Sequence, residues 1–204
     1  HGIRPAYYYV NDEVIVAASE RASIRTSFNV GENEVLELMP GNALIVDNNG
    51  EYKIEQVLAP KERRACSFER IYFSRGSDEK IYRERIALGE HLSKAVLESV
   101  DYSLKNTIFS YIPNTAEVAF YGLVKGMEDY LNQIKIQRIL SWGKDFNEEK
   151  LSEMINRKIR QEKIAIKDVK LRTFITEDSG RNEMVQHVYD ITYGTVKRDE
   201  DTLV

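Results

Sequence analysis

The spacing of apolar positions along the chain changes near residue 65. Before that point, short β-favouring runs alternate with tight turns; after it come one continuous apolar run and several long stretches with helical spacing. Residues 65–92 lie at this change, and a segment in such a position commonly joins two structural units. We therefore interpret it as a joint, read from the pattern alone as a core strand followed by a surface helix.

The first third predicts two β-hairpins. Residues 6–10 and 14–18 are β-favouring runs separated by a short polar loop. Residues 42–46 and 52–57 flank a turn whose Asn-Gly pair readily takes the positive φ that hairpin turns require. Both hairpins are expected to belong to one β-rich part of the chain.

Two helices are predicted around this region. Ser19 is placed to cap a short helix over residues 20–25, and Asp78 to cap a longer one that ends near Ser99. Gly89 lies in the middle of the longer helix at a cost of roughly 0.5–1 kcal/mol relative to alanine, which indicates close packing against another backbone. The apolar stripe of this helix is expected to comprise Ile81, Leu88, Leu92, Ala95 and Val96.

Residues 107–112 form a continuous apolar run of the kind found in buried parallel strands. Pro113 ends the run, and Asn114 and Glu117 predict a capping box at the start of a helix that extends to about Gln137. Strand, turn and helix open a βαβ unit, whose ligands favour the loop at the strand's carboxyl end. The helix N-terminus could hold a phosphate there, although the residues alone favour simple capping by Asn114.

The stretch from residue 142 to 165 predicts a surface helix, capped by Asp145 and reaching about Gln161. Residues 157–172 carry seven basic residues against two acidic ones, a local excess that could bind nucleic acid. No aromatic side chains are interleaved with them, so a solvated helix face is the favoured interpretation and nucleic-acid binding is disfavoured.

Composition adds few constraints. The 204 residues carry a net charge of −4, which gives no general attraction to nucleic acid or to anionic membranes. A single cysteine excludes an internal disulfide framework and fits a reducing compartment. No apolar run approaches the roughly 18 residues of a membrane span, and the start does not resemble a signal peptide. We predict a cytoplasmic protein, and both ends suggest a fragment of a longer one.

Residues 66–78, CSFERIYFSRGSD, resemble the C-x-x-E-Y/F-I/V-Y-F-A/S-R-P-D-S segment of amidophosphoribosyltransferases, also called glutamine phosphoribosylpyrophosphate amidotransferases. Several shorter matches occur in the family's order: residues 2–5, 16–20 and 40–45, and Arg85 with Leu88 and Gly89. The chain departs from the family segment at two positions, where Arg70 replaces an aromatic residue and Gly76 replaces the proline.

This resemblance implies a composite α+β and α/β fold. Residues 1–64 would be the β-rich tail of an N-terminal-nucleophile glutaminase domain, and residues 65–104 a linking strand and helix. Residues 105–204 would begin a type I phosphoribosyltransferase-like, Rossmann-like domain with an insertion at about 142–166. The parent would be a homo-oligomeric glycosyltransferase that makes 5-phosphoribosylamine from phosphoribosylpyrophosphate and glutamine in purine biosynthesis.

The resemblance also implies substrate-binding residues. Pro113, Asn114 and Thr115 match the family's I/V-P-E/D-T/S-S pyrophosphate loop, in which Thr115 would be a Mg²⁺ ligand. The segment KDVKLRTFI resembles the flap that folds over phosphoribosylpyrophosphate; Arg172 matches the flap arginine, and Lys167 its lysine if one residue is deleted. Asn114 departs from the family's acidic residue at this position.

No catalytic residue is expected within the chain. The family's glutaminase nucleophile is a cysteine at the mature N-terminus, where this chain has His1. Cys66 matches a cysteine that ligates an iron–sulfur cluster in some members, but such clusters usually need four cysteines. A buried, inert thiol is the favoured interpretation, and the isolated chain is expected to be inactive.

Two other classes of protein remain open. A non-catalytic regulatory or scaffolding relative would account for the departures at Asn114, Ala116, Val188 and Tyr193, where the family has acidic, hydroxyl or basic residues. An RNA- or polyanion-binding module would use the basic stretch 157–172.

Overall fold

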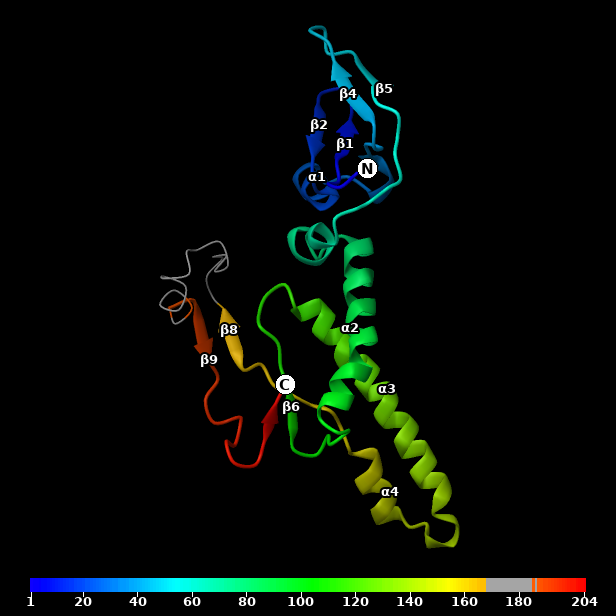
Figure 1. Ribbon diagram of the computed structural model, residues 1–204, viewed down its shortest axis with the longest axis vertical. Helices are drawn as coiled ribbons and strands as arrows, with labels where there is room; N and C mark the ends of the chain where they lie inside the picture. The colour runs from blue at the N-terminus through cyan, green and yellow to red at the C-terminus, as the bar shows by residue number, and fades with distance from the viewer. Residues whose placement is uncertain (168–184, 186) are drawn as a thin grey trace. The chain divides into compact units, whose positions relative to one another are not determined.

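The computed structural model describes residues 1–167, 185 and 187–204. It shows a mixed α+β fold with several small antiparallel sheets and one three-stranded parallel sheet (Figure 1). The chain divides into two compact units, His1–Tyr82 and Arg83–Val204. Within the described residues, no helix combines the length and apolar character needed to cross a membrane.

The first predicted hairpin is confirmed in unit 1. Strands β1 (Tyr7–Val10) and β2 (Ile15–Ala18) pair antiparallel, and the short β3 (Leu36–Glu37) pairs with the other edge of β1. The side-chain carboxamide of Asn11 accepts hydrogen bonds from two backbone N–H groups in the connecting turn. The core of this unit is formed by Tyr9, Ile24 and Val35.

Helix α1 (Arg21–Phe28) begins one residue later than predicted, and Ser19 does not cap it. Glu20 occupies the N-cap position in an extended conformation, and its carboxylate accepts a hydrogen bond from the backbone N–H of Arg75 at 3.1 Å. The predicted cap was therefore wrong, because contact with residue 75, distant in sequence, fixes Glu20 at the cap position. A short 3₁₀ turn, η1 (Glu32–Glu34), follows.

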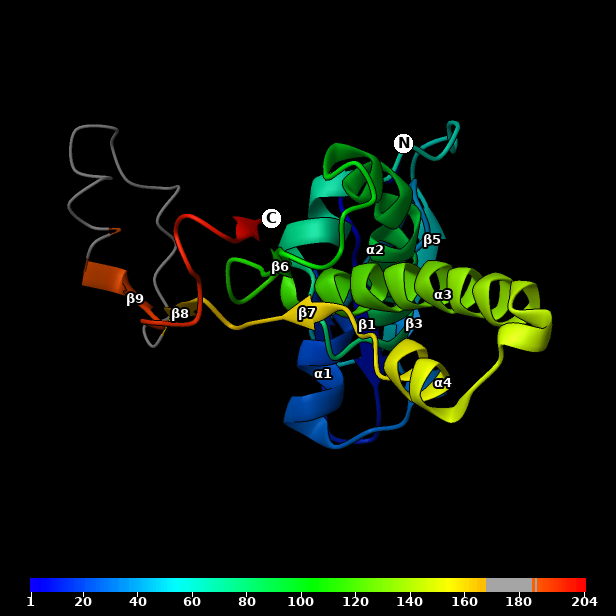
Figure 2. The same ribbon diagram turned by 90° about the horizontal axis from the view of Figure 1, so that it is seen from below.

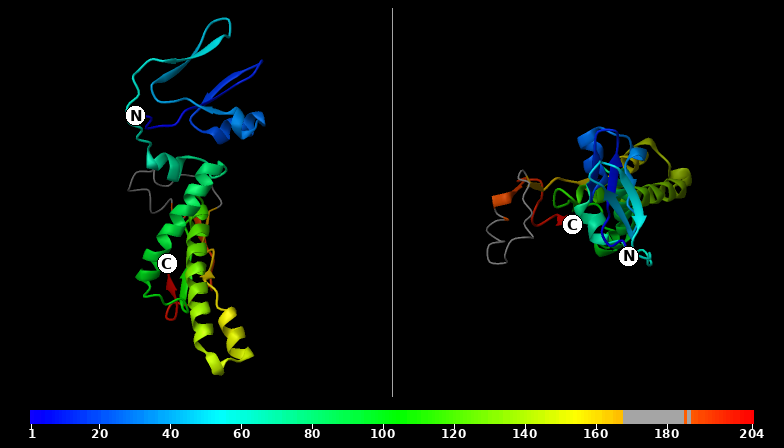
Figure 3. Two further views of the ribbon diagram at one scale, coloured as in Figure 1. Left: turned by 90° about the vertical axis from the view of Figure 1, so that its right-hand side faces the viewer. Right: turned by 90° about the horizontal axis from the view of Figure 1, so that it is seen from above.

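The second hairpin is also confirmed, as β4 (Asn42–Val46) and β5 (Tyr52–Gln56) (Figure 3). The Asp47 carboxylate accepts hydrogen bonds from the N–H groups of Asn49 and Glu51, which closes the turn. Gly50 takes the positive φ of +86° that the sequence predicted for this turn. The five residues of β5 are all exposed, so this hairpin forms a two-stranded ribbon within unit 1.

The strand expected at the start of the joint is a helical turn instead. Residues Glu69–Phe73 form a π-helix, η2, in which the rings of Phe68, Tyr72 and Phe73 pack with centroids 5.4–5.5 Å apart. A helical turn places these three rings on one side, whereas a strand would have alternated them between two faces. The prediction of a strand was wrong because aromatic residues favour β-structure only where a sheet is present to receive them.

The long helix of the joint is confirmed as α2 (Glu79–Ser99), and Asp78 is its cap. The Asp78 carboxylate accepts hydrogen bonds from the backbone N–H groups of Lys80 at 3.0 Å and Ile81 at 3.3 Å. These bonds satisfy N–H groups that have no partner inside the helix.

Close packing at Gly89 is confirmed in unit 2, where α2 contacts the long helix α3 (Glu117–Ser141). A Cβ atom on Gly89 would lie 1.8 Å from the carbonyl oxygen of Ala119, and one on Gly122 would lie 2.0 Å from that of Ile86. Glycines on both helices therefore let the two backbones touch.

The apolar stripe predicted for α2 was partly wrong. Leu88 and Leu92 are about half exposed, at 45% and 51%. The buried positions of α2 within unit 2 are instead Arg85, Gly89, Ser93 and Leu97, spaced four residues apart. At Gly89 the backbone of α3 comes so close that no side chain fits, which is why the buried row differs from the predicted leucine stripe.

The parallel strand predicted over residues 107–112 is confirmed only in its first half, as β6 (Thr107–Phe109), all three of whose residues are buried. It lies between β10 (Thr202–Leu203) and β7 (Arg160–Gln161), and both neighbours run parallel to it. The core of unit 2 packs around Phe109 and comprises Leu97, Phe120, Leu123, Val124, Met127, Leu131 and Ile159.

Helix α4 (Glu148–Ile155) replaces the longer surface helix that the sequence predicted. Its cap is Asn147, whose side chain accepts a hydrogen bond from the N–H of Lys150 at 2.8 Å; the predicted cap, Asp145, belongs to a 3₁₀ turn, η3 (Gly143–Asp145). The helix lies beside the second half of α3 (Figures 1 and 2). The helical prediction failed beyond Ile155 because the chain then enters the sheet as β7.

A further antiparallel pair, β8 (Ala165–Lys167) and β9 (Tyr189–Ile191), was not predicted. Its register places Lys167 opposite Tyr189. The sequence analysis had placed residues 165–166 at the end of the insertion and Lys167 at the start of the flap.

Candidate functional site

The three strands of the parallel sheet end at one edge, where open α/β sheets bind ligands. Ser110 directly follows β6 at this edge. Its backbone N–H donates to the carbonyl oxygen of Val204 at 2.9 Å, and its hydroxyl accepts from the N–H of Ile164 at 3.3 Å. Ser110 therefore joins the segments that follow all three strands.

The loop over residues 111–116 connects this edge to α3. Pro113 is buried, Thr115 is half-buried, and Asn114 is exposed to solvent. The predicted capping box at Asn114 was wrong: Ala116 occupies the N-cap position without a side-chain bond, and only the carbonyl group of Asn114 accepts, from the N–H of Glu117 at 3.2 Å. The Asn114 side chain is thus not committed to capping α3.

The Glu117 carboxylate instead accepts hydrogen bonds from two tyrosine hydroxyl groups. Tyr111 donates to its Oε1 atom at 3.0 Å and Tyr121 donates to the same atom at 2.9 Å. Burial and the Glu117 carboxylate raise the pKa of Tyr111 to about 12, so its hydroxyl remains a donor at neutral pH. The ring of Tyr111 packs against Phe120 with centroids 5.0 Å apart.

The sequence analysis missed this cluster. Tyr121 lies four residues after Glu117, a spacing at which helical side chains meet, and that signal was available. The contribution of Tyr111 depends on how the loop returns to the helix, which no local pattern reveals.

Of the two predicted flap residues, only Lys167 lies within the described residues. It is half-buried on β8, and its Nζ atom lies 5.3 Å from the ring centroid of Tyr189. Arg172 lies outside the described residues, so its place in the site stays a prediction. Strands β8 and β9 precede and follow the segment in which it occurs.

The oxygen atoms of the loop are compatible with Mg²⁺ in one arrangement only, in which the protein supplies a single ligand. Within the described parts of the chain, no group of three or more His, Cys, Asp or Glu side chains could hold a metal ion. Mg²⁺ often takes one or two protein oxygens and completes its shell with phosphate and water. The hydroxyl of Thr115 fits as a single protein ligand of an ion that arrives with a phosphorylated compound.

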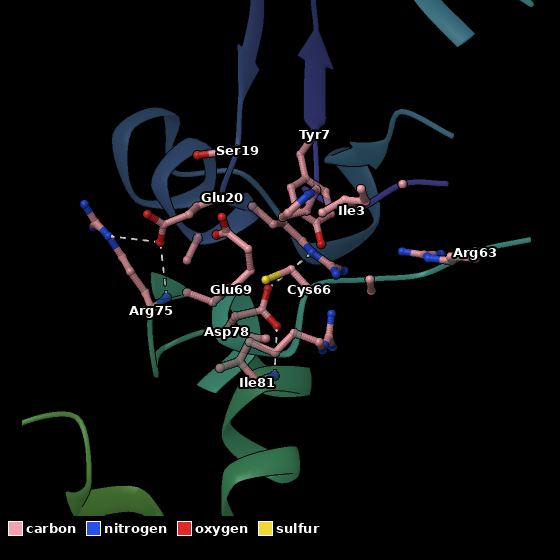
Figure 4. Close-up of a pocket in the computed structure, with 17 residues that line it drawn as sticks. Ile3, Tyr7, Ser19, Glu20, Arg63, Cys66, Glu69, Arg75, Asp78 and Ile81 are labelled. Atoms are coloured by element: carbon pink, nitrogen blue, oxygen red, sulfur yellow. Dashed lines mark hydrogen bonds and ion pairs between the residues drawn. The ribbon is translucent and has the colours of Figure 1, made fainter. Parts of the chain in front are cut away.

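Cys66 lies at a small polar cavity in unit 1 (Figure 4). The cavity measures about 30 Å³, enough for about one water molecule and too small for a substrate. Beside it, Arg21 Nε lies 3.3 Å from the Asp78 carboxylate, and the guanidinium group lies 5.0 Å from the ring centroid of Tyr7. Arg21, Asp78 and Tyr7 therefore form a largely buried polar contact within unit 1.

The thiol of Cys66 is half-buried, less enclosed than the sequence predicted. Its backbone N–H donates to the carbonyl oxygen of Ile3 at 2.9 Å. Cys66 is the only cysteine of the sequence, so a cluster held by four cysteines could not be built from this chain alone.

The part of the basic stretch that the structure describes, residues 157–167, contains strands β7 and β8 and no helix. Arg157 forms an ion pair with Glu153 at 3.2 Å, and Arg160 Nη1 lies 2.8 Å from the carboxylate of Asp201. Arg160 also donates to the carbonyl oxygen of Thr195 at 2.6 Å. A hydrogen bond from the Lys197 N–H and the nearby Arg160 guanidinium lower the pKa of Asp201. Arg157 and Arg160 therefore engage acids of this chain, which disfavours a surface organised for polyanions.

Comparison with known protein families finds no match for this sequence, and comparison with curated proteins finds none either. The function must therefore be argued from the motifs and from the geometry of the sheet edge.

Proposed function

We propose that the chain is part of an amidophosphoribosyltransferase and that the loop over residues 111–116 binds the pyrophosphate group of phosphoribosylpyrophosphate. One observation carries the proposal: the segment that resembles the family's pyrophosphate loop follows the central strand of a parallel sheet, at its carboxyl edge. This is the edge at which phosphorylated ligands bind in open α/β sheets.

In this proposal, Thr115 supplies one oxygen to a Mg²⁺ ion that is otherwise held by phosphate and water. The ion neutralises phosphate charge that the loop alone could not balance. Asn114 contacts the pyrophosphate with its exposed carboxamide, and Lys167 and Arg172 add positive charge from the flap.

The finer fold assignment belongs to the same proposal. The hairpins of unit 1 would be the end of a glutaminase domain, and the parallel sheet of unit 2 the first half of a phosphoribosyltransferase-like domain. The glutaminase nucleophile of the family is an N-terminal cysteine. The one cysteine of the 204 residues, Cys66, lies in the joint, so these residues supply no such nucleophile and should not hydrolyse glutamine by themselves.

Calorimetry of the 204-residue chain with phosphoribosylpyrophosphate tests the proposal. We expect binding that requires Mg²⁺ and that weakens about tenfold in Thr115→Ala, the loss expected for one strong polar contact. Ser141→Ala removes a hydroxyl at the other end of α3 and should bind like the wild type. Failure of the wild-type chain to bind, or equal binding by Thr115→Ala, would contradict the proposal.

A further inference from the structure

The two ends of the loop over residues 111–116 are connected by side chains. Tyr111 opens the loop directly after Ser110, and Glu117 is the first residue of α3. The hydroxyl of Tyr111 donates to Glu117 Oε1 at 3.0 Å, so this hydrogen bond spans the whole loop. Tyr121, one helical turn further on, donates to the same oxygen at 2.9 Å.

These contacts restrict both partners of the bond. The ring of Tyr111 is half-buried against Phe120, which limits the directions in which its hydroxyl can point. The Glu117 carboxylate receives two donors on one atom, and hydrogen bonds to a charged acceptor are about twice as strong as neutral ones. Few rotamers of Glu117 satisfy both donors at once.

A loop whose ends are fixed in this way loses less conformational freedom when a ligand binds. The benefit is largest where the ligand contacts are made by the loop's own middle residues, as proposed for Asn114 and Thr115. Pro113 is buried and anchors the same segment from the inside.

We infer that Tyr111, Glu117 and Tyr121 are positioning residues that hold this loop in the conformation that binds pyrophosphate. The inference rests on the proposed function for its ligand, while the clamp, meaning the contact of Tyr111 and Tyr121 with Glu117, rests on the two hydrogen bonds between these side chains. None of the three needs to touch the ligand: they act through the loop.

Three variants separate positioning from simple packing. Glu117→Ala removes the acceptor and should weaken Mg²⁺-dependent binding of phosphoribosylpyrophosphate about tenfold. Glu117→Gln keeps an amide oxygen that can accept both hydroxyl groups, so it should retain most of the affinity. Tyr111→Phe keeps the ring against Phe120 and should weaken binding roughly threefold.

The matched control is Tyr130→Phe, which removes a half-buried tyrosine hydroxyl further along α3 and should bind like the wild type. A second readout is the ultraviolet titration of tyrosine. In Glu117→Ala the pKa of Tyr111 should fall part of the way from about 12, because the acceptor carboxylate is gone while burial, the larger cause of the raised pKa, remains.

The outcomes distinguish the two proposals. If the wild-type chain binds no phosphoribosylpyrophosphate, the proposed function fails, and the ligand assigned to the loop fails with it. If the wild type binds and Glu117→Ala binds equally well, only the clamp is refuted. The clamp is also refuted if Glu117→Gln loses as much affinity as Glu117→Ala, or if the Tyr111 titration does not move.

Discussion

Replacing Gly89 by alanine tests the contact between α2 and α3 directly. In the structure, the added Cβ would lie 1.8 Å from the carbonyl oxygen of Ala119 and 2.6 Å from the backbone nitrogen of Leu123. Both are backbone atoms, so no side chain can rotate away. To regain a carbon–oxygen distance of about 3.5 Å, the helices must separate by roughly 1.5 Å at this point.

Two opposing terms set the size of the effect. Alanine is favoured over glycine inside a helix by about 1 kcal/mol. Overpacking a tight contact costs typically about 1–3 kcal/mol, and the upper end applies here because only backbone can move. We therefore expect a net loss of about 2 kcal/mol in the free energy of unfolding, or roughly 4–8 °C in Tm for a chain of this size.

Thermal and urea unfolding followed by circular dichroism would measure this loss. Gly126→Ala is the matched control on α3, because its Cβ would first meet the Ser93 side chain, at 2.6 Å from the hydroxyl, while the nearest backbone atom, the carbonyl oxygen of Glu90, lies 3.2 Å away. Its loss of stability should be clearly smaller. If Gly89→Ala proved as stable as the wild type, the helix would not need glycine at this position, and the close backbone contact would be refuted.

Two further predictions concern charged side chains. Asp78→Ala removes both the cap of α2 and the partner of Arg21, and should lower the free energy of unfolding by about 3 kcal/mol. Asp78→Asn keeps the cap and should lose less; equal losses in urea titrations would show that the cap contributes nothing, and no loss in Asp78→Asn would show the same of the ion pair. Because the folded protein lowers the pKa of Asp201, the stabilisation it gives is present above about pH 4 and is lost as the pH falls through the folded value. Stability measured between pH 7 and pH 2 should therefore fall less steeply in Asp201→Asn than in the wild type, and parallel curves would contradict this.

Local patterns were sufficient for the hairpins and for β6. In the hairpins, β-favouring runs flank short polar turns, and a turn such as that at Gly50 needs only a few neighbouring residues. The continuous apolar run of β6 was equally local, since a strand covered on both faces needs apolar residues throughout. The role of Gly89 could also be predicted, because a helix accepts such a costly residue only where something else approaches closely.

Elements defined by distant partners could not be predicted. Strand β7 consists of Arg160 and Gln161, a pair with no apolar or β-favouring residue, and it exists because β6 offers an open edge beside it. Similarly, Glu20 caps α1 in contact with Arg75, far away in the sequence. In both places a tertiary contact overrides the local preference. The local pattern alone therefore predicted a longer helix in place of α4 and β7, and Ser19 in place of Glu20 at the start of α1.

The missed strand matters for the proposed site. The resemblance assigned Thr115 and Lys167 to the same substrate, but no local pattern in the sequence showed what brings their two segments to one edge of a sheet. Because β7 pairs with β6, the segments after both strands start at the same edge, and the Ser110 hydroxyl accepts a hydrogen bond from Ile164 between them. The chain from Ile164 then leads directly into β8, which carries Lys167. In the proposed pyrophosphate site, the loop and the flap must start from the same edge of the sheet. The pairing of β7 with β6 places both starting points at that edge.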